Sequence, residues 1–167
     1  DEYDVVREVR RAANRGQAKP ANAVTEAVDL VVAATTDVHG RLTGWDYYAG
    51  APDPSRGLAR AASIVDSLRS ANPDHVVLVD AGDILQGNPL SFVAARIDTT
   101  HRNPAIAAMN VMRYDAAAVG NHDFGYGLGT LDRAIKDASF PLLAANAYLA
   151  SGPRAYPAYV IVRRGGL

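Results

Sequence analysis

The sequence contains no cysteine among its 167 residues, and this absence excludes several kinds of site. A chain without thiols has no disulfide framework, no thiolate zinc site and no cysteine nucleophile. The absence does not assign a cellular compartment, because a domain with a large enough core needs no disulfide even outside the cell. Any metal-binding or catalytic site must be built from carboxylates, amides, hydroxyls and the four histidines.

The sequence also lacks an excess of charge of either sign. Seventeen basic residues stand against eighteen acidic ones, which gives a net charge of −1. Nucleic-acid polymers and anionic membrane surfaces usually bind proteins with an excess of Lys and Arg, so we expect neither as a partner. No apolar run approaches the ~18 residues of a membrane-spanning helix. Asp29 interrupts the best candidate.

The composition that is present is that of a globular domain. Apolar residues make up 49% and charged residues 21% of the chain. A chain of this length can bury roughly two-thirds of the surface that it exposes when unfolded. In residues 1–24, apolar residues fall at helical spacing among Arg and Glu, and Gly16 and Pro20 end this pattern. We therefore predict a short helix and a linker arm there. Residues 25–167 are predicted to belong to one domain.

Beyond the arm, buried strand patterns alternate with amphipathic helix patterns. Such alternation predicts βαβ crossovers and therefore the α/β class, with a mostly parallel sheet and flanking helices. The predicted strands are 28–35, 75–79, 116–119, 142–147 and 159–162, and the predicted helices are 58–68, 103–112 and 128–138.

Polar clusters follow three of the predicted strands, at residues 36–40, 80–83 and 120–123. Ligands in open α/β sheets bind beyond the carboxyl ends of the strands, where these clusters would meet. On an extended backbone, Asp37 and His39 would point to the same side. Each cluster alone could equally be ordinary turn chemistry with a surface histidine.

Together, the three clusters match the needs of a dinuclear metal site. Such a site needs one carboxylate to bridge two cations ~3.5–4 Å apart, with further oxygen and nitrogen donors around each cation. Carboxylate, amide and imidazole ligands suit Mn, Fe or Zn.

These clusters resemble the first three motifs of the metallophosphoesterase superfamily. The matching segments are Asp37-Val38-His39, Gly82-Asp83 and Gly120-Asn121-His122-Asp123. Residues 80–89 and 140–146 resemble the bacterial 5′-nucleotidase branch, and residues 45–48 resemble the periplasmic 2′,3′-cyclic-nucleotide 2′-phosphodiesterase/3′-nucleotidase subgroup. The resemblance implies that residues 25–167 are the N-terminal part of a calcineurin-like αββα sandwich whose C-terminal part is absent.

The resemblance also implies a role for each matched residue. Asp37 and His39 would bind the first metal, Asp83 would bridge both metals and Asn121 would bind the second. The cofactors would be two divalent metal ions. Mn, Zn and Fe are preferred over Mg, Ca and Co. His122 would be catalytic without being a ligand, either stabilising the transition state or assisting the leaving oxygen.

The activity implied is hydrolysis of nucleotide phosphoesters by a two-metal-activated hydroxide. The substrates would be those of a 2′,3′-cyclic-nucleotide phosphodiesterase or of a 3′- or 5′-nucleotidase, in the periplasm or outside the cell. The family completes its site with later histidines, and neither His75 nor His101 stands where those ligands should be. We therefore expect an incomplete site that needs the remainder of the catalytic domain and a C-terminal substrate-recognition domain. The alternative is a truncated phosphoesterase fold that binds without turnover.

Four further residues are candidates for the site. Relatives often place a carboxylate near the catalytic histidine, and Asp123 could fill that role because Gln86 and Gly125 occupy the two corresponding positions. Asn88 could reach the phosphate or serve a turn. Tyr47 and Tyr48 could stack on a nucleobase or pack over the sheet edge.

Overall fold

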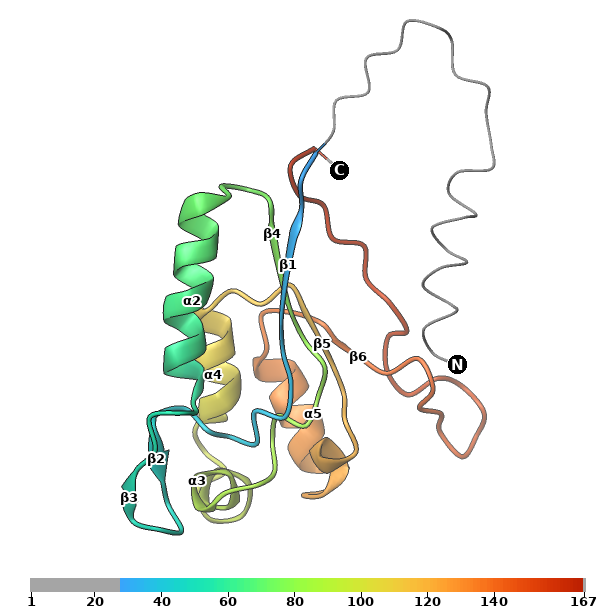
Figure 1. The fold of residues 1–167 in the computed structure, drawn as a ribbon. Helices are drawn as coiled ribbons and strands as arrows, with labels where there is room; N and C mark the ends of the chain where they lie inside the picture. The colour runs from blue at the N-terminus through green and yellow to red at the C-terminus, as the bar shows by residue number, and fades with distance from the viewer. Residues whose placement is uncertain (1–27, 167) are drawn as a thin grey trace, which may run out of the picture.

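The computed structural model describes residues 28–166 and is shown in Figure 1. The predicted arm at residues 1–24 lies outside the described residues. A four-stranded parallel sheet forms the centre, in the order β1-β4-β5-β6. The strands are β1 (Val31–Thr35), β4 (Val76–Asp80), β5 (Ala116–Ala118) and β6 (Leu142–Leu143). The predicted α/β class and mostly parallel sheet are confirmed.

Three helices connect successive strands and share one hydrophobic core. They are α2 (Leu58–Ala71), α4 (Pro104–Val111) and α5 (Leu128–Asp137). Each strand pairs with the next one along the same direction of the sheet, so right-handed crossovers bring all three helices to the same face. Figure 1 shows them gathered beside the sheet. The shared core includes Val65 of α2, Leu78 of β4, Met109 of α4 and Leu131 of α5.

The other face of the sheet is much less covered by the described residues. Val76 and Leu78 are buried under the helices, whereas Val77 and Val79 of the same strand are only half-buried. Val32 of β1 is 62% exposed. The described residues thus contain one helix layer and one main sheet of the expected four-layer sandwich. A separate hairpin, β2 (Trp45–Asp46) with β3 (Ala51–Pro52), lies outside that sheet.

The end of the described chain differs from the prediction. The predicted strand at 142–147 is only two residues long, and residues 159–162 form no strand, so that prediction is wrong. After β6 the chain turns back, with the Ala144 N–H donating to the Pro157 carbonyl at 2.9 Å. Tyr159 and Ile161 are 76% and 68% exposed. A strand-like apolar run becomes a strand only where it pairs with a neighbour, and residues 159–162 pair with no strand of the described residues.

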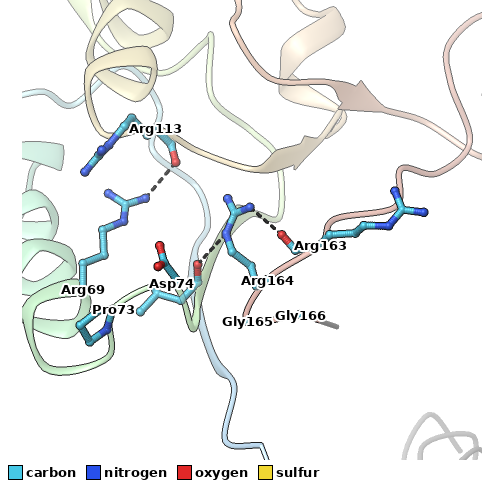
Figure 2. Close-up of a pocket in the computed structure, with 9 residues that line it drawn as sticks. Arg69, Pro73, Asp74, Arg113, Arg163, Arg164, Gly165 and Gly166 are labelled. Atoms are coloured by element: carbon cyan, nitrogen blue, oxygen red, sulfur yellow. Dashed lines mark hydrogen bonds between the residues drawn. The ribbon is translucent and has the colours of Figure 1, made fainter.

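Arg164 attaches the end of this segment to the amino-terminal end of β4, and Figure 2 shows the arginines around it. Arg164 donates to the Val76 carbonyl at 3.3 Å and forms an ion pair with Asp115. Arg69 donates to the Met112 carbonyl at 2.7 Å, at the end of α4. In Figure 2 the Arg163 guanidinium points away from this cluster. The guanidiniums of Arg69 and Arg164 are thus engaged by backbone carbonyls and, for Arg164, by the Asp115 carboxylate.

The remaining elements are short. They are α3 (Pro89–Phe92), a π-helical turn η1 (Val93–Ile97) and a 3₁₀ turn η2 (His122–Phe124). Among the helices of residues 28–166, none has the length and apolar character needed to cross a bilayer.

Candidate metal centre

The loops after β1 and β4 are joined by backbone hydrogen bonds. The Asp37 N–H donates to the Gly82 carbonyl at 3.0 Å, and the His39 N–H donates to the Asp83 carbonyl at 2.9 Å. The Gly40 N–H continues the series to the Ile84 carbonyl at 2.8 Å. These bonds set the side chains of the first cluster beside that of Asp83.

Three of the four predicted metal ligands meet there. Asp37, His39 and Asp83 each offer a donor atom, and these atoms all lie within 4.8 Å of one another. The Nε2 atom of His39 lies 3.6 Å from the Asp37 Oδ1 atom. Two carboxylates and one imidazole at this spacing can bind a shared divalent cation.

The same three residues have left-handed backbone conformations. Their φ angles are +54° for Asp37, +50° for His39 and +62° for Asp83. Such conformations cost L-residues energy and occur preferentially at functional sites. The expectation that an extended backbone aligns Asp37 with His39 is therefore wrong. β1 ends at Thr35, and successive tight turns bring the two side chains together.

The backbone of Gln86 fixes the tautomer of His39. The Nδ1 atom of His39 contacts the Gln86 carbonyl oxygen, which can only accept a hydrogen bond. Nδ1 therefore carries the proton, and the Nε2 lone pair is free for a cation. Gly87 permits this approach, because a Cβ atom at Gly87 would lie 2.6 Å from the His39 Cβ atom.

The loop after β5 contacts the cluster of Asp37, His39 and Asp83 through Asp83. The His122 N–H donates to the Asp83 Oδ1 atom at 2.8 Å. Gly120 packs so closely that a Cβ atom there would lie 2.2 Å from this oxygen. Asn121, the fourth predicted ligand, lies between Gly120 and His122 in this loop. It is exposed, and its side chain does not cap the turn that follows.

Asp123 has a structural position that the sequence did not indicate. Its side chain is fully buried and accepts hydrogen bonds from the N–H groups of Gly120, Asp83, Ile84 and Leu85 at 2.8–3.0 Å. Burial raises the pKa of its carboxyl group, although these hydrogen bonds oppose the shift. The expectation that Asp123 orients His122 is wrong, because its carboxylate faces the loop backbone and holds two loops together.

Asp80 is a second buried carboxylate, at the end of β4. It accepts hydrogen bonds from Thr35 Oγ1 at 2.5 Å and from the Gly82 N–H at 2.8 Å. Burial raises the pKa of Asp80 from 3.8 to about 6. Sequence reasoning missed this residue, although an acidic residue that ends a buried strand is itself a signal.

His122 lies beside the metal ligands with its side chain accessible. Its ring centroid lies 5.1 Å from that of His39, and the ring planes meet at 84°. Its Nδ1 atom lies 3.3 Å from the Gln86 Oε1 atom. The imidazole can therefore face a group bound at the metal ligands without being one of them.

Asn88 holds the loop through both polar groups of its side chain. It is 4% exposed, and its Oδ1 atom accepts the Ser91 N–H at 3.0 Å, which caps α3. Its Nδ2 group donates to the His39 carbonyl at 2.7 Å. These hydrogen bonds give Asn88 a role in capping α3 and in joining it to the loop that carries His39.

An aromatic hollow of about 610 Å³ opens next to His122. Tyr48, Phe92 and Tyr126 line it, and Tyr48 and Phe92 are 74% and 49% exposed. The rings of Phe92 and Tyr126 meet edge to face, with centroids 6.4 Å apart. Tyr47 is not part of this lining. Sequence reasoning missed Phe92 and Tyr126, because the three rings come from separate segments.

Comparison with known proteins agrees with this geometry. The sequence profile of the family "Calcineurin-like phosphoesterase" matches residues 30–165. The trifunctional nucleotide phosphoesterase protein YfkN of Bacillus subtilis (strain 168) is 43% identical over 140 residues, covering 80% of this chain and 10% of that protein. The 2′,3′-cyclic-nucleotide 2′-phosphodiesterase/3′-nucleotidase of Haemophilus influenzae is 45% identical over 131 residues, covering 77% of this chain and 20% of that protein.

A solved structure shows the same fold. The crystal structure of the calcineurin-like phosphoesterase YfkN from Bacillus subtilis superposes with a TM-score of 0.75 at 42% identity, covering 80% of this chain and 41% of that chain. The chain belongs to the calcineurin-like phosphoesterase family. It spans about a tenth to a fifth of the length of these two curated relatives.

Proposed function

We propose that the intact protein is a metal-dependent hydrolase of nucleotide phosphoesters, of the 2′,3′-cyclic-nucleotide phosphodiesterase or 3′- or 5′-nucleotidase type. The observation that carries the proposal is the cluster of Asp37, His39 and Asp83 donor atoms within 4.8 Å of one another. The names of the two relatives describe nucleotide phosphoesterases, which supports the substrate class.

The donor set fits divalent cations. Asp37 and Asp83 offer carboxylate oxygens, and His39 offers Nε2 because its Nδ1 proton is already donated to Gln86. We assign Asp37 and His39 to a first cation, Asp83 to a bridging position and Asn121 to a second cation, with Mn, Zn or Fe as the preferred ions. When bound, such ions act as Lewis acids that activate water and neutralise phosphate charge.

Residues of the chain itself would orient the substrate and stabilise the charge on its phosphate group. We assign the imidazole of His122 the role of stabilising charge on the phosphate oxygens or of assisting the departing oxygen. The hydrogen bond from the His122 N–H to Asp83 keeps the catalytic residue in register with the metal ligands. Asp123 contributes indirectly, by fixing the loops that carry Asp83 and Gly120.

The aromatic hollow is the proposed binding place of the nucleobase. Its rings offer planar apolar faces beside His122, and base stacking on an aromatic side chain contributes ~1–3 kcal/mol in nucleic-acid sites. Few directional polar groups face it, so it would accept different bases. This assigns Tyr48 a substrate contact and leaves Tyr47 outside the site.

The proposal extends to the rest of the protein, since the relatives are several times longer than the chain. We propose that the remainder of the catalytic domain supplies further metal ligands and covers the open face of the sheet. A C-terminal domain would add substrate recognition. The resemblance of residues 45–48 to a periplasmic subgroup supports a periplasmic or secreted location.

A direct test is the hydrolysis of bis(p-nitrophenyl) phosphate and of 2′,3′-cyclic AMP by the full-length protein. We expect turnover with Mn²⁺, loss of turnover after chelation with EDTA, and recovery when Mn²⁺ is restored. A full-length protein that binds Mn²⁺ but hydrolyses neither ester would contradict the enzyme proposal. That result would favour a phosphoesterase fold that binds without turnover.

A further inference from the structure

Gln86 contacts both histidines of the site, each through a different part of the residue. Its backbone carbonyl accepts the Nδ1 proton of His39. Its side-chain Oε1 atom lies 3.3 Å from the Nδ1 atom of His122. The two rings lie 5.1 Å apart and nearly perpendicular to each other, and this one residue contacts both of them.

The contact to His122 defines a tautomer. An amide oxygen only accepts hydrogen bonds, so the Nδ1 atom of His122 carries the proton in this arrangement. The Nε2 atom is then the ring nitrogen left for a bound phosphoester. A carboxylate partner would impose the same tautomer, but Gln86 does so without adding a negative charge beside the phosphate.

The backbone around Gln86 leaves room for this arrangement. A Cβ atom at Gly125 would lie 1.9 Å from the Gln86 Oε1 atom, so any larger residue there would displace the amide. Gly87, the next residue, admits the His39 ring in the same way. The two glycines thus permit the close contacts on either side of Gln86.

The nearest acidic candidate for this role is otherwise engaged. Both carboxylate oxygens of Asp123 accept backbone N–H groups from the loops around Asp83. Within residues 28–166, the hydrogen-bonding contact of the His122 ring is the one to Gln86. Among the described residues, the partner of the His122 ring is therefore an amide and not a carboxylate.

We propose that Gln86 is the positioning residue of the site, holding His122 in its Nδ1–H tautomer while its backbone does the same for the metal ligand His39. The inference rests on the proposed hydrolase function. The side chain acts on His122, whereas the carbonyl that serves His39 is present whatever the side chain is. Side-chain variants therefore isolate the effect on His122.

Two variants of the full-length protein test the inference. Gln86→Met keeps the length of the side chain but removes the acceptor, and Gln86→Glu keeps an acceptor. We expect Gln86→Met to lower kcat by about 10–100-fold, the range found for partners that orient site residues, with KM and bound Mn²⁺ unchanged. Gln86→Glu should retain kcat to within a few-fold.

Nitrogen-15 NMR of the histidine rings in the Zn²⁺-loaded protein supplies a readout independent of turnover. The wild type and Gln86→Glu should show His122 protonated at Nδ1, and Gln86→Met should shift it toward the Nε2–H form. An unchanged tautomer and unchanged kcat in Gln86→Met would overturn the inference. Loss of metal together with kcat would overturn it too, because Gln86 would then support the metal ligands instead.

The failure of the proposed function would look different. A wild-type protein that turns over no phosphoester contradicts the hydrolase assignment, whatever Gln86 does. The NMR comparison still decides whether Gln86 sets the tautomer of His122 in that case.

Discussion

The backbone N–H of His122 donates a hydrogen bond to the Asp83 Oδ1 atom at 2.8 Å, which joins the loop after β5 to the proposed bridging metal ligand. The two residues lie on loops that follow different strands, β5 and β4. One carboxylate thus belongs to the candidate metal-binding group and also fixes the backbone of the proposed catalytic residue. Changes at either residue should therefore have separable effects on metal binding and on turnover.

Asp83→Asn in the full-length protein should lower bound metal at both positions, because one carboxylate serves both cations. Turnover should fall by about 100-fold or more, which exceeds the usual loss when a residue that only orients a metal ligand is removed. The amide oxygen can still accept the His122 N–H, so the loop should keep its shape. Metal content by mass spectrometry and the kcat for bis(p-nitrophenyl) phosphate measure the two effects. His122→Asn is the control, since it should depress turnover and keep both metals. An active Asp83→Asn variant with full metal content would contradict the bridging role.

The buried carboxyl group of Asp80 predicts a pH dependence of stability. Its pKa is about 6 in the folded chain and 3.8 when unperturbed. Below pH 4 the carboxyl group is protonated in both the folded and the unfolded state, so it does not lower the free energy of unfolding. Between pH 4 and 6 the folded state holds the proton more tightly, so the free energy of unfolding should fall as pH rises. The total fall should be about 3 kcal/mol and level off above pH 6.

Asp80→Asn should remove this contribution. Urea unfolding of the metal-free protein, compared between wild type and variant from pH 4 to pH 7, gives the difference directly. The variant should gain stability relative to the wild type as pH rises. A difference that stays constant over this range would show that Asp80 does not titrate as described.

The aromatic hollow predicts a dependence on the base of the substrate. Phe92→Ala should lower kcat/KM for adenosine 5′-monophosphate by about tenfold, the lower part of the range for one stacking contact. It should leave kcat/KM for ribose 5-phosphate, which has no base, nearly unchanged. Ile97→Ala is the matched control, because Ile97 is 68% exposed in the adjoining turn but does not line the hollow. Equal losses on both substrates would argue against base binding there.

The pair of Arg164 and Asp115 predicts a local contribution to stability. The Asp115 side chain is 8% exposed, and it also accepts the Leu78 N–H at 2.8 Å. Arg164→Met should destabilise the fold by about 1–3 kcal/mol, because it leaves a buried carboxylate without its charged partner. Arg163→Met should change the unfolding free energy by less than about 0.5 kcal/mol, since its side chain points away. Similar losses from both substitutions, measured by urea unfolding, would refute the specific role of Arg164.

Much of the fold could be predicted from the sequence, because its signals are local and repeated. Apolar helical spacing within α2 and the Asn103-Pro104 start of α4 both belong to single segments. Once strands alternate with helices, the parallel sheet and the meeting of three loops at one edge follow from general topology. That topology predicts that Asp37, His39 and Asp83 lie close together, as they do.

The parts that could not be predicted depend on contacts between segments. The left-handed turns at Asp37 and His39 are stabilised by backbone bonds to the next loop, which the local sequence does not encode. The burial of Asp123 depends on N–H groups nearly forty residues away. The apolar run at 159–162 looked like a strand because strand propensity cannot tell whether a partner edge exists.

The central claim is that Asp37, His39 and Asp83 bind shared divalent cations, and anomalous diffraction from crystals of the full-length protein soaked in Mn²⁺ tests it most directly. We predict Mn²⁺ peaks within ~2.0–2.3 Å of the Asp37 and Asp83 carboxylates and of the His39 Nε2 atom, with Asp83 shared between two ions. Peaks at other residues, with these three side chains free of metal, would contradict the account.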